Sequence, residues 1–407
     1  MNDVQKLLLK IMGAVLFGVE VPKIDASNIE PLLTESKAQT VFPLVFSAIE
    51  NQVKNSVSNE KYAEYSQLYF MCITAGVCNF AEHGELHKLM SDNGVEYVAI
   101  KGIASAMYYK NPSLRSAGDV DILVKEEDFE QTGRLFESIG FIKEAEDDGD
   151  IHTAYKRPPI SVWELHKKVN GIPNNDIGKL IETEIDKVIQ SAKLENIDGT
   201  SCMVPDKFHH GLIMLLHIVS HLTGEGVGLR HLCDWVVFVS SMSDEEFVFT
   251  FENKLKEFGL WKFAQILTAL GVRYLNAPKR SYVVESENDE TLQALMEDIL
   301  NGGNFGFKDM NRYREIKYIS DREDGTVKRG GIIAQGFKTL NRKVYDRYQV
   351  VERYRVLLPL GWVLEISKYF GLLISGKRKS TDTKSMLKEA KKRKKIYSSL
   401  ELFDVNN

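Results

Sequence analysis

The chain has 407 residues, of which 43% are hydrophobic and 27% charged, and its formal net charge is −5. This length and composition allow a substantial buried core and two or three domains. The four cysteines, Cys72, Cys78, Cys202 and Cys233, show no Cys-x-x-Cys spacing, which argues against a zinc ribbon and a disulfide framework. The apolar stretch Asp3–Phe17 lacks the basic segment and cleavage site of a signal peptide, so we expect a cytoplasmic protein.

Hydrophobic periodicity predicts that residues 1–90 are mostly helical. Lys6–Met12 opens one predicted helix, and Tyr62–Met90 forms a longer one. We expect this region to pack against the sheet formed by the residues that follow it.

Residues 91–170 are expected to form an α/β core. Val95–Ile100 has the pattern of a strand, Lys101-Gly102 that of a tight turn, and Ile103–Tyr109 that of the start of a helix. A strand that enters a helix through glycine lets backbone N–H groups approach an anion, and Lys101 would add a positive charge. Arg115 could supply a second cation, with a planar fork suited to phosphate oxygens. These features predict a phosphate site.

The most informative stretch is Gly118–Val124, in which Asp119 and Asp121 lie two residues apart. Side chains alternate along a strand, so both carboxylates project from one face while the intervening apolar side chains enter a core. Two like charges held close together are unfavourable unless a bound cation or a shared proton relieves them. Ligands that are all oxygens suit Mg²⁺ or Mn²⁺ better than Zn²⁺.

Another carboxylate, Glu164, lies in a predicted strand further along the chain. After a predicted helix over Phe129–Ile139 and a strand near Phe141, the pattern predicts two strands joined by a proline turn, His152–Lys156 and Ile160–His166. Glu164 would lie in the middle of the second strand. Asp147, Asp148 and Asp150 are closer in sequence to the Asp-x-Asp pair, but they belong to an acidic loop that we expect to be solvated.

This arrangement resembles the minimal core of the polymerase-β-type nucleotidyltransferases. The run from Ile100-Lys101-Gly102 to the Asp-x-Asp strand is similar to an uncharacterised bacterial branch, in which Lys-Gly stands where better-known members have Gly-Gly or Gly-Ser. The similarity extends through Trp163–His166 and Leu229–Trp235 and covers the middle third of the chain. The Lys-Gly turn leaves open whether Lys101 contacts phosphate, caps the turn or closes on a substrate.

The resemblance implies a metal-dependent nucleotidyltransferase, with ATP or another nucleoside triphosphate (NTP) as substrate. It would move a nucleoside monophosphate to an acceptor hydroxyl and release pyrophosphate. The implied ligands of Mg²⁺ (or Mn²⁺), also the catalytic residues, are Asp119, Asp121 and Glu164. The implied nucleotide-binding residues are Lys101, Gly102, Arg115 and Gly118. The alternative is that Asp-x-Asp is a solvated strand end, Lys101 a solvated turn residue and Arg115 a member of a plain salt bridge.

After Gly171 the pattern predicts a largely helical region, with helices over Ile177–Ile189, Pro205–Leu222, Leu229–Ser240, Asp244–Phe258, Trp261–Leu275 and Leu292–Leu300. His217 and His221 share a helix face, as two zinc ligands would, but the His-Glu-x-x-His pattern is absent. A packed or hydrogen-bonded histidine face is one alternative. The other is that His217, His221, Arg230 and Asp234 line the acceptor side of a cleft.

The C-terminal part carries two basic runs, Gly376–Lys379 and Lys391–Lys395, on a chain that is acidic overall. The apolar stretches Val356–Leu364 and Tyr369–Ile374 precede them and are too short and broken to span a membrane. The tail could bind an anionic membrane surface or nucleic acid, or it could be a solvated terminal helix.

The predicted fold class is α+β, with a small mixed β-sheet nucleotidyltransferase core flanked by helices and a largely α-helical C-terminal domain. The predicted boundaries are 1–90 (helical), 91–170 (catalytic core), 171–330 (helical domain) and 331–407 (helical with a basic tail). A small-molecule acceptor is favoured. The alternatives are a macromolecular acceptor, such as a protein or a tRNA, and a non-catalytic nucleotide-binding or membrane-associated interaction protein.

Overall fold

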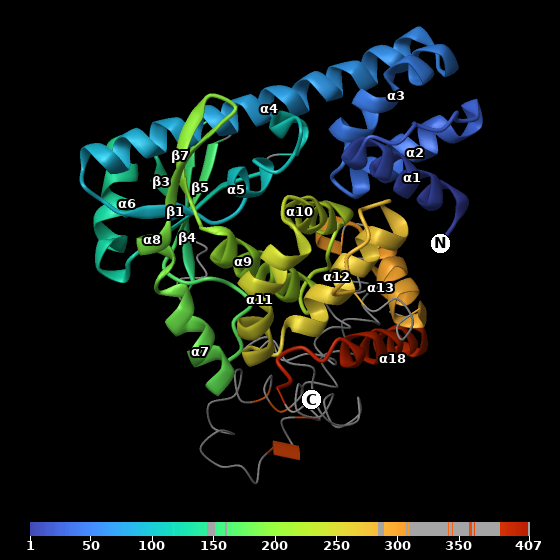
Figure 1. The fold of residues 1–407 in the computed structure, drawn as a ribbon. Helices are drawn as coiled ribbons and strands as arrows, with labels where there is room; N and C mark the ends of the chain where they lie inside the picture. Colours follow the sequence, from blue (N-terminus) through green and yellow to red (C-terminus); the bar gives the residue numbers. More distant parts are fainter. Residues whose placement is uncertain are drawn as a thin grey trace.

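The computed structural model describes residues 1–116, 118–144, 151–158, 161–283, 289–306 and 383–405, and the single residues 308, 341, 344, 358, 359 and 362. A small mixed sheet is flanked by helices, and a second group of helices lies beside it (Figure 1). The predicted fold class is therefore confirmed. The acidic loop at 145–150 lies outside the described residues.

The N-terminal region consists of four helices, α1 (Asp3–Phe17), α2 (Ala26–Ala38), α3 (Phe42–Ser56) and α4 (Asn59–Asp92). The first three pack together, and α1 also contacts α12 (Trp261–Tyr274). The 34-residue α4 leaves this bundle and runs along the sheet (Figure 1). At about 1.5 Å per residue it spans roughly 50 Å, so this one helix connects the bundle to the sheet.

The five-stranded sheet has the order β1-β2-β5-β4-β3 and comprises β1 (Tyr97–Ala99), β2 (Val120–Val124), β3 (Ile142–Lys143), β4 (His152–Arg157) and β5 (Ser161–His166). Strands β2 and β5 are parallel, and the other neighbours are antiparallel. One face is apolar: Val120, Ile122, Trp163 and Leu165 pack against α4 and α6 (Phe129–Ser138). Because side chains alternate, Asp121 and Glu164 project from the opposite face.

Some local elements differ from the sequence expectations. Helix α5 (Ile103–Ala106) ends three residues earlier than expected, and short 3₁₀ helices follow at η1 (Pro112–Leu114) and η2 (Glu126–Asp128). The expected helix over 177–189 is divided into α7 (Asp176–Ile185) and α8 (Val188–Ser191). A hairpin, β6 (Lys193–Ile197) and β7 (Thr200–Val204), was not predicted and contacts α4 and β1.

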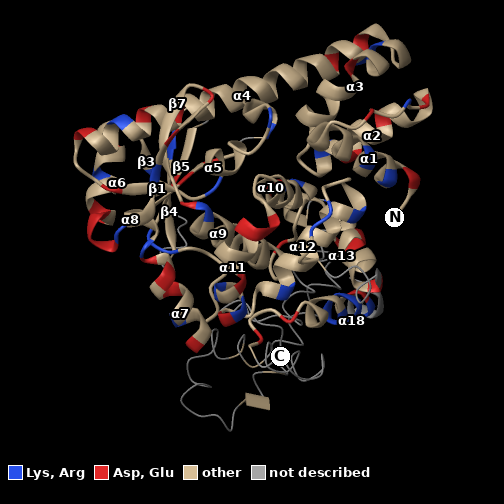
Figure 2. Ribbon diagram, viewed as in Figure 1, with Lys and Arg blue, Asp and Glu red and all other residues tan. Residues whose placement is uncertain are grey.

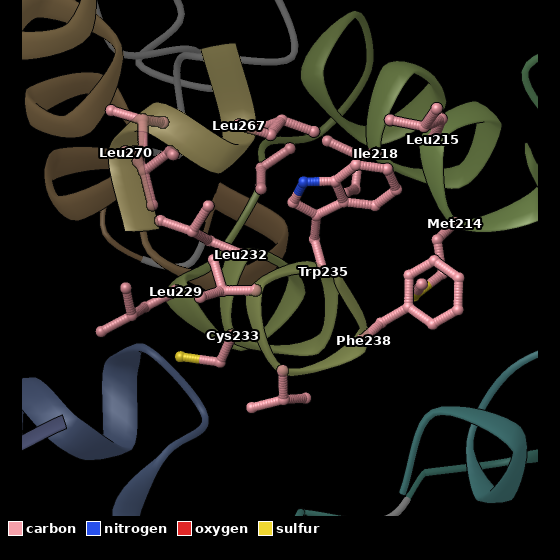
Figure 3. Packing of buried hydrophobic residues seen from close by; sticks show 14 of the residues in the cluster. Met214, Leu215, Ile218, Leu229, Leu232, Cys233, Trp235, Phe238, Leu267 and Leu270 are labelled. Atoms are coloured by element: carbon pink, nitrogen blue, oxygen red, sulfur yellow. The ribbon is translucent and has the colours of Figure 1, made fainter. Parts of the chain in front are cut away.

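The helical domain contains α9 (Lys207–Leu222), α10 (Leu229–Ser240), α11 (Asp244–Glu257), α12, α13 (Asp289–Gly302) and η3 (Asn304–Gly306). Figure 3 shows its core, in which Trp235 and Phe238 of α10 lie among apolar side chains of α9 and α12. The indole nitrogen of Trp235 donates a hydrogen bond to Thr268 Oγ1 over 3.1 Å. This packing fixes the orientation of α9 and α10, whose polar residues therefore face the sheet.

Helix α18 (Thr383–Ser399) packs against α13 and carries the second basic run. Lysine and arginine residues gather on it in Figure 2. Lys391 is exposed, but Arg393 is buried, and its Nε donates to Asp298 Oδ1 over 3.0 Å. The run at 376–379, the stretch at 369–374 and most of 356–364 lie outside the described residues. No helix in the described part of the chain is long and apolar enough to cross a membrane.

The two kinds of basic residue on α18 should respond differently to substitution. Arg393→Ala removes a guanidinium that contacts the buried Asp298 carboxylate, which should lower the free energy of unfolding by about 3 kcal/mol. Lys391→Ala changes an exposed position and should stay within about 0.5 kcal/mol of the parent protein. Urea unfolding followed by circular dichroism measures both values. Equal stabilities of the two variants would contradict a structural role for Arg393.

Candidate active site

The polar face of the sheet and helices α9 and α10 enclose a cleft of about 1410 Å³. Residues from segments far apart in the sequence meet there. Every site residue that the sequence predicted lines this cleft, namely Lys101, Gly102, Arg115, Gly118, Asp119, Asp121, Glu164, His217, His221, Arg230 and Asp234. The roles of these residues stay predictions.

Asp121 and Glu164 are direct neighbours because β2 and β5 are parallel and pair these two residues in register. Asp121 is 9% exposed, and its Oδ1 accepts from Lys101 Nζ over 2.7 Å and lies 3.0 Å from His166 Nε2. Burial alone would raise the pKa of Asp121, but the charge of Lys101 and the contact with His166 hold it well below its usual value. Asp121 is therefore an ionised, compensated carboxylate.

Asp119 lies just before β2 and is exposed to the cleft. Its position depends on the preceding residue, since the Gly118 carbonyl accepts a hydrogen bond from Asn79 Nδ2 of α4 over 2.9 Å. Partial dehydration and the charges of Glu164 and Asp121 raise the pKa of Asp119 to about 6. The raised pKa reflects burial first and the neighbouring negative charge second, and a bound cation would relieve the second effect.

The chemistry of this donor set fits divalent metal ions that prefer oxygen. Among the described residues, groups able to ligate one ion within 4.8 Å of one another occur twice, at His217, His221 and His231 and at His152, Glu164 and His166. Asp119, Asp121 and Glu164 do not form such a compact group, so they are more widely spaced than the ligands of one ion. Two ions about 3.5–4 Å apart require a wider set of this kind.

Lys101 follows β1 and turns back onto Asp121. The next residue, Gly102, has a φ of 51° and a ψ of −105°, a conformation that an L side chain rarely adopts. Burial would lower the pKa of Lys101, but Asp121, Glu164 and Asp119 raise it, so the ammonium is charged. It compensates the carboxylates, and contact with phosphate stays a prediction.

Arg115 forms a buried ion pair with Asp234 of α10. Its Nε donates to Oδ1 over 2.9 Å and its Nη2 to Oδ2 over 2.8 Å, and the Tyr109 hydroxyl donates to Oδ1 over 2.8 Å. This bidentate contact ties the segment before the Asp-x-Asp strand to the helical domain. It matches the salt-bridge alternative for Arg115. A phosphate or acceptor contact by either partner would require the pair to open.

The helical wall of the cleft carries His217 and His221 on α9 and Arg230 and His231 on α10. Burial, with the charges of Lys101 and Arg230, lowers the pKa of His221 to about 4, and burial also holds the pKa of His217 and of His231 well below the usual value. Arg230 Nη1 donates to the Ser116 carbonyl over 3.2 Å. This wall therefore presents neutral imidazoles beside one guanidinium.

Sequence reasoning missed His152 and His166 as members of the site. His166 Nε2 lies 3.3 Å from Glu164 Oε2, and His152 Nε2 lies 3.9 Å from Glu164 Oε1. Strands β4 and β5 pair His152 with His166. The alternation of Glu164 with His166, together with the proline turn that sets the register of the two strands, would have indicated this face.

In the absence of metal, Asp119→Asn and Asp121→Asn should change the free energy of unfolding in opposite directions. Because the pKa of Asp119 is raised to about 6, its charge opposes folding above that pH, and Asp119→Asn should stabilise by up to about 1 kcal/mol after solvent screening. The pKa of Asp121 is lowered, so its charge contributes stability at neutral pH. Asp121→Asn should therefore destabilise by about 3 kcal/mol.

Thermal unfolding at pH 7.5 with a chelator measures both shifts. Equal shifts of the same sign would contradict the unequal compensation of the two carboxylates.

Among solved structures, an antigenic nucleotidyltransferase-like protein from Paracoccidioides brasiliensis is similar over 51% of this chain and 97% of that chain, at 16% sequence identity and a TM-score of 0.31. No curated protein matches the chain. A family model described as "Uncharacterised nucleotidyltransferase" matches residues 25–276, which is more than half of the chain and includes all three cleft carboxylates. The chain therefore belongs to this family of uncharacterised nucleotidyltransferases.

Proposed function

We propose that the protein transfers a nucleoside monophosphate from an NTP to an acceptor hydroxyl and releases pyrophosphate. One observation carries the proposal: Asp121 and Glu164 are paired on parallel strands, with Asp119 beside them, on the floor of a cleft of about 1410 Å³. The Lys101-Gly102 turn further supports placing the chain in the Lys-Gly branch of the superfamily.

Asp119, Asp121 and Glu164 are the residues that would hold Mg²⁺ or Mn²⁺. When bound, the ions would compensate charge on the attacking oxygen, the α-phosphate and the leaving pyrophosphate. A cation at Asp121 has to share or displace the Lys101 ammonium, which now contacts Oδ1 over 2.7 Å. The displaced ammonium would then be available to a phosphate oxygen, which gives Lys101 a role in each state.

The protein's own groups account for the remaining steps. We assign Glu164 to accept the proton of the acceptor hydroxyl as the hydroxyl oxygen forms a bond to the α-phosphorus. The bond to the pyrophosphate oxygen breaks in the same displacement. Arg230 carries a buried Nε for which the described residues provide no hydrogen-bond partner, and we assign it to an anionic group of the nucleotide or the acceptor.

A small-molecule acceptor remains the favoured substrate class. The cleft has room for a nucleotide and a second small molecule, and the helical wall supplies His217, His221 and Arg230 as polar contacts. A protein or tRNA acceptor is the alternative that the basic tail suggested. None of the described residues of α18 lines the cleft, so their charge gives that alternative no direct support at the site.

Incubation with each α-labelled NTP and Mg²⁺ or Mn²⁺, with and without cell extract, tests the proposal. Label on a small molecule supports the favoured acceptor class, and label on protein or RNA supports the macromolecular one. Binding of an NTP without any transfer would instead favour a non-catalytic nucleotide-binding protein.

Removing single cleft carboxylates should abolish the transfer. Asp119→Asn, Asp121→Asn and Glu164→Gln each remove a charge that acts in the transition state, so each should lower kcat by at least about 10²-fold. Glu130→Gln is a matched control, because Glu130 is exposed on α6, on the other side of the sheet. Full activity of all three cleft variants would refute the assignment.

Metal binding should depend on pH through Asp119. A carboxyl with a pKa of about 6 is protonated, and a poor ligand, below that pH, so Mn²⁺ affinity should fall as the pH decreases through about 6. An unperturbed aspartate would keep its affinity down to about pH 4. Titration calorimetry between pH 5 and 8 measures the dependence, and the decrease near pH 6 should be smaller in Asp119→Asn than in the parent protein.

A further inference from the structure

We infer that His152, Glu164 and His166 form a metal site with mixed nitrogen and oxygen ligands, which binds Mn²⁺ or Zn²⁺ in preference to Mg²⁺. The binding site itself stands on the geometry of these three residues. Its use in catalysis rests on the proposed function, because Glu164 is also a proposed ligand there. Imidazole nitrogen suits zinc and other transition metals, whereas Mg²⁺ prefers oxygen ligands.

The strand geometry brings the three side chains to one point. Glu164 and His166 are two residues apart on β5, and β4 pairs His152 with His166 across the sheet. Their ligand atoms lie within 4.8 Å of one another. The rings of His152 and His166 are stacked, with centroids 4.9 Å apart, so both imidazoles present their edges to the same carboxylate.

The contacts around His166 Nε2 favour an ion over a hydrogen bond. This nitrogen lies 3.0 Å from Asp121 Oδ1 and 3.3 Å from Glu164 Oε2, yet it carries at most one hydrogen. Ligands about 2.1 Å from a common ion lie about 3.0 Å apart at right angles and about 3.4 Å apart in a tetrahedron. These two separations therefore match the edges of a coordination polyhedron, whereas the 3.9 Å between His152 Nε2 and Glu164 Oε1 is longer and would have to shorten when an ion binds.

The second histidine cluster of the cleft, His217, His221 and His231, is the natural comparison. There the Gly228 amide donates to His231 Nδ1 over 3.3 Å. The ring proton of His231 is therefore on Nε2, and this nitrogen has no lone pair for a metal ion. The neighbouring charges at that cluster are mainly the cations Lys101 and Arg230, together with the Asp121 carboxylate, which acts on His221. His166 Nδ1, in contrast, has no hydrogen-bond partner among the described residues, so the proton can move there and free Nε2.

The local charge also favours a cation at the cluster on the sheet, which consists of His152, Glu164 and His166. Asp119, Asp121 and Glu164 contribute three carboxylates near this point, and Lys101 is the ammonium that interacts with all three. The excess is negative, whereas the cluster on α9 and α10 lies beside positive charge. Of the two compact clusters, the one on the sheet is therefore the metal site.

The test uses the full chain after removal of metal with a chelator. Calorimetry should give an Mn²⁺ affinity at least about tenfold above that for Mg²⁺, and pulsed electron paramagnetic resonance of bound Mn²⁺ should detect imidazole nitrogen. His152→Ala should weaken Mn²⁺ binding by roughly tenfold or more and change Mg²⁺ binding little. His217→Ala, in the other cluster, should change neither affinity. His152→Gln and a circular dichroism spectrum control for misfolding.

The outcomes separate this inference from the proposed function. Absence of the nitrogen signal, equal losses for both metals in His152→Ala, or loss of Mn²⁺ in His217→Ala would overturn the site. If the wild-type protein transfers nucleotides and His152→Ala binds Mn²⁺ as tightly as the wild type, the proposed function holds and the metal site is wrong. If His152 contributes to Mn²⁺ binding but the protein transfers no nucleotide, the metal site holds and the proposed function is wrong.

Discussion

The structure depends on how it compensates three carboxylates crowded onto one face of a small sheet. Parallel pairing of β2 and β5 places Asp121 beside Glu164, and Asp119 adds a further charge at the cleft. One lysine and one histidine contact the buried Asp121, whereas Asp119 keeps a pKa of about 6. The fold thus tolerates an unfavourable charge arrangement, which the apolar face packed on α4 and α6 holds in place.

The helical domain supports this arrangement from the other side of the cleft. The bidentate Arg115–Asp234 pair joins the segment before β2 to α10, and Tyr109 satisfies the same carboxylate. Helix α10 is itself fixed by Trp235 and Phe238 in the core shown in Figure 3. Any relative movement of the two walls would therefore have to break or carry along a buried, charged hydrogen-bond pair. This contact therefore resists separation of the two walls.

Much of the fold and of the candidate site could be predicted from local patterns. The period of two in Gly118–Val124 placed both aspartates on one face, and the proline turn placed Glu164 within a strand that pairs with β2. The hairpin β6–β7 was missed, although Asp198-Gly199, with φ values of 51° and 85°, is the dipeptide typical of such a turn. The partner of Arg115 could not be predicted, because Asp234 is 119 residues away and only tertiary packing brings it there.

The Lys-Gly turn gains a physical meaning from these contacts. A lysine at this position places its ammonium 2.7 Å from the central carboxylate, where it compensates charge without metal. The positive φ of Gly102 makes the turn tight enough for that contact. A glycine or serine in place of Lys101 would leave Asp121 in contact with His166 but without the ammonium, and would increase the need for an ion. Lys101 thus stabilises the metal-free protein and lowers the affinity of Asp121 for a metal ion. This effect links Lys101 to metal binding whether or not its ammonium contacts phosphate.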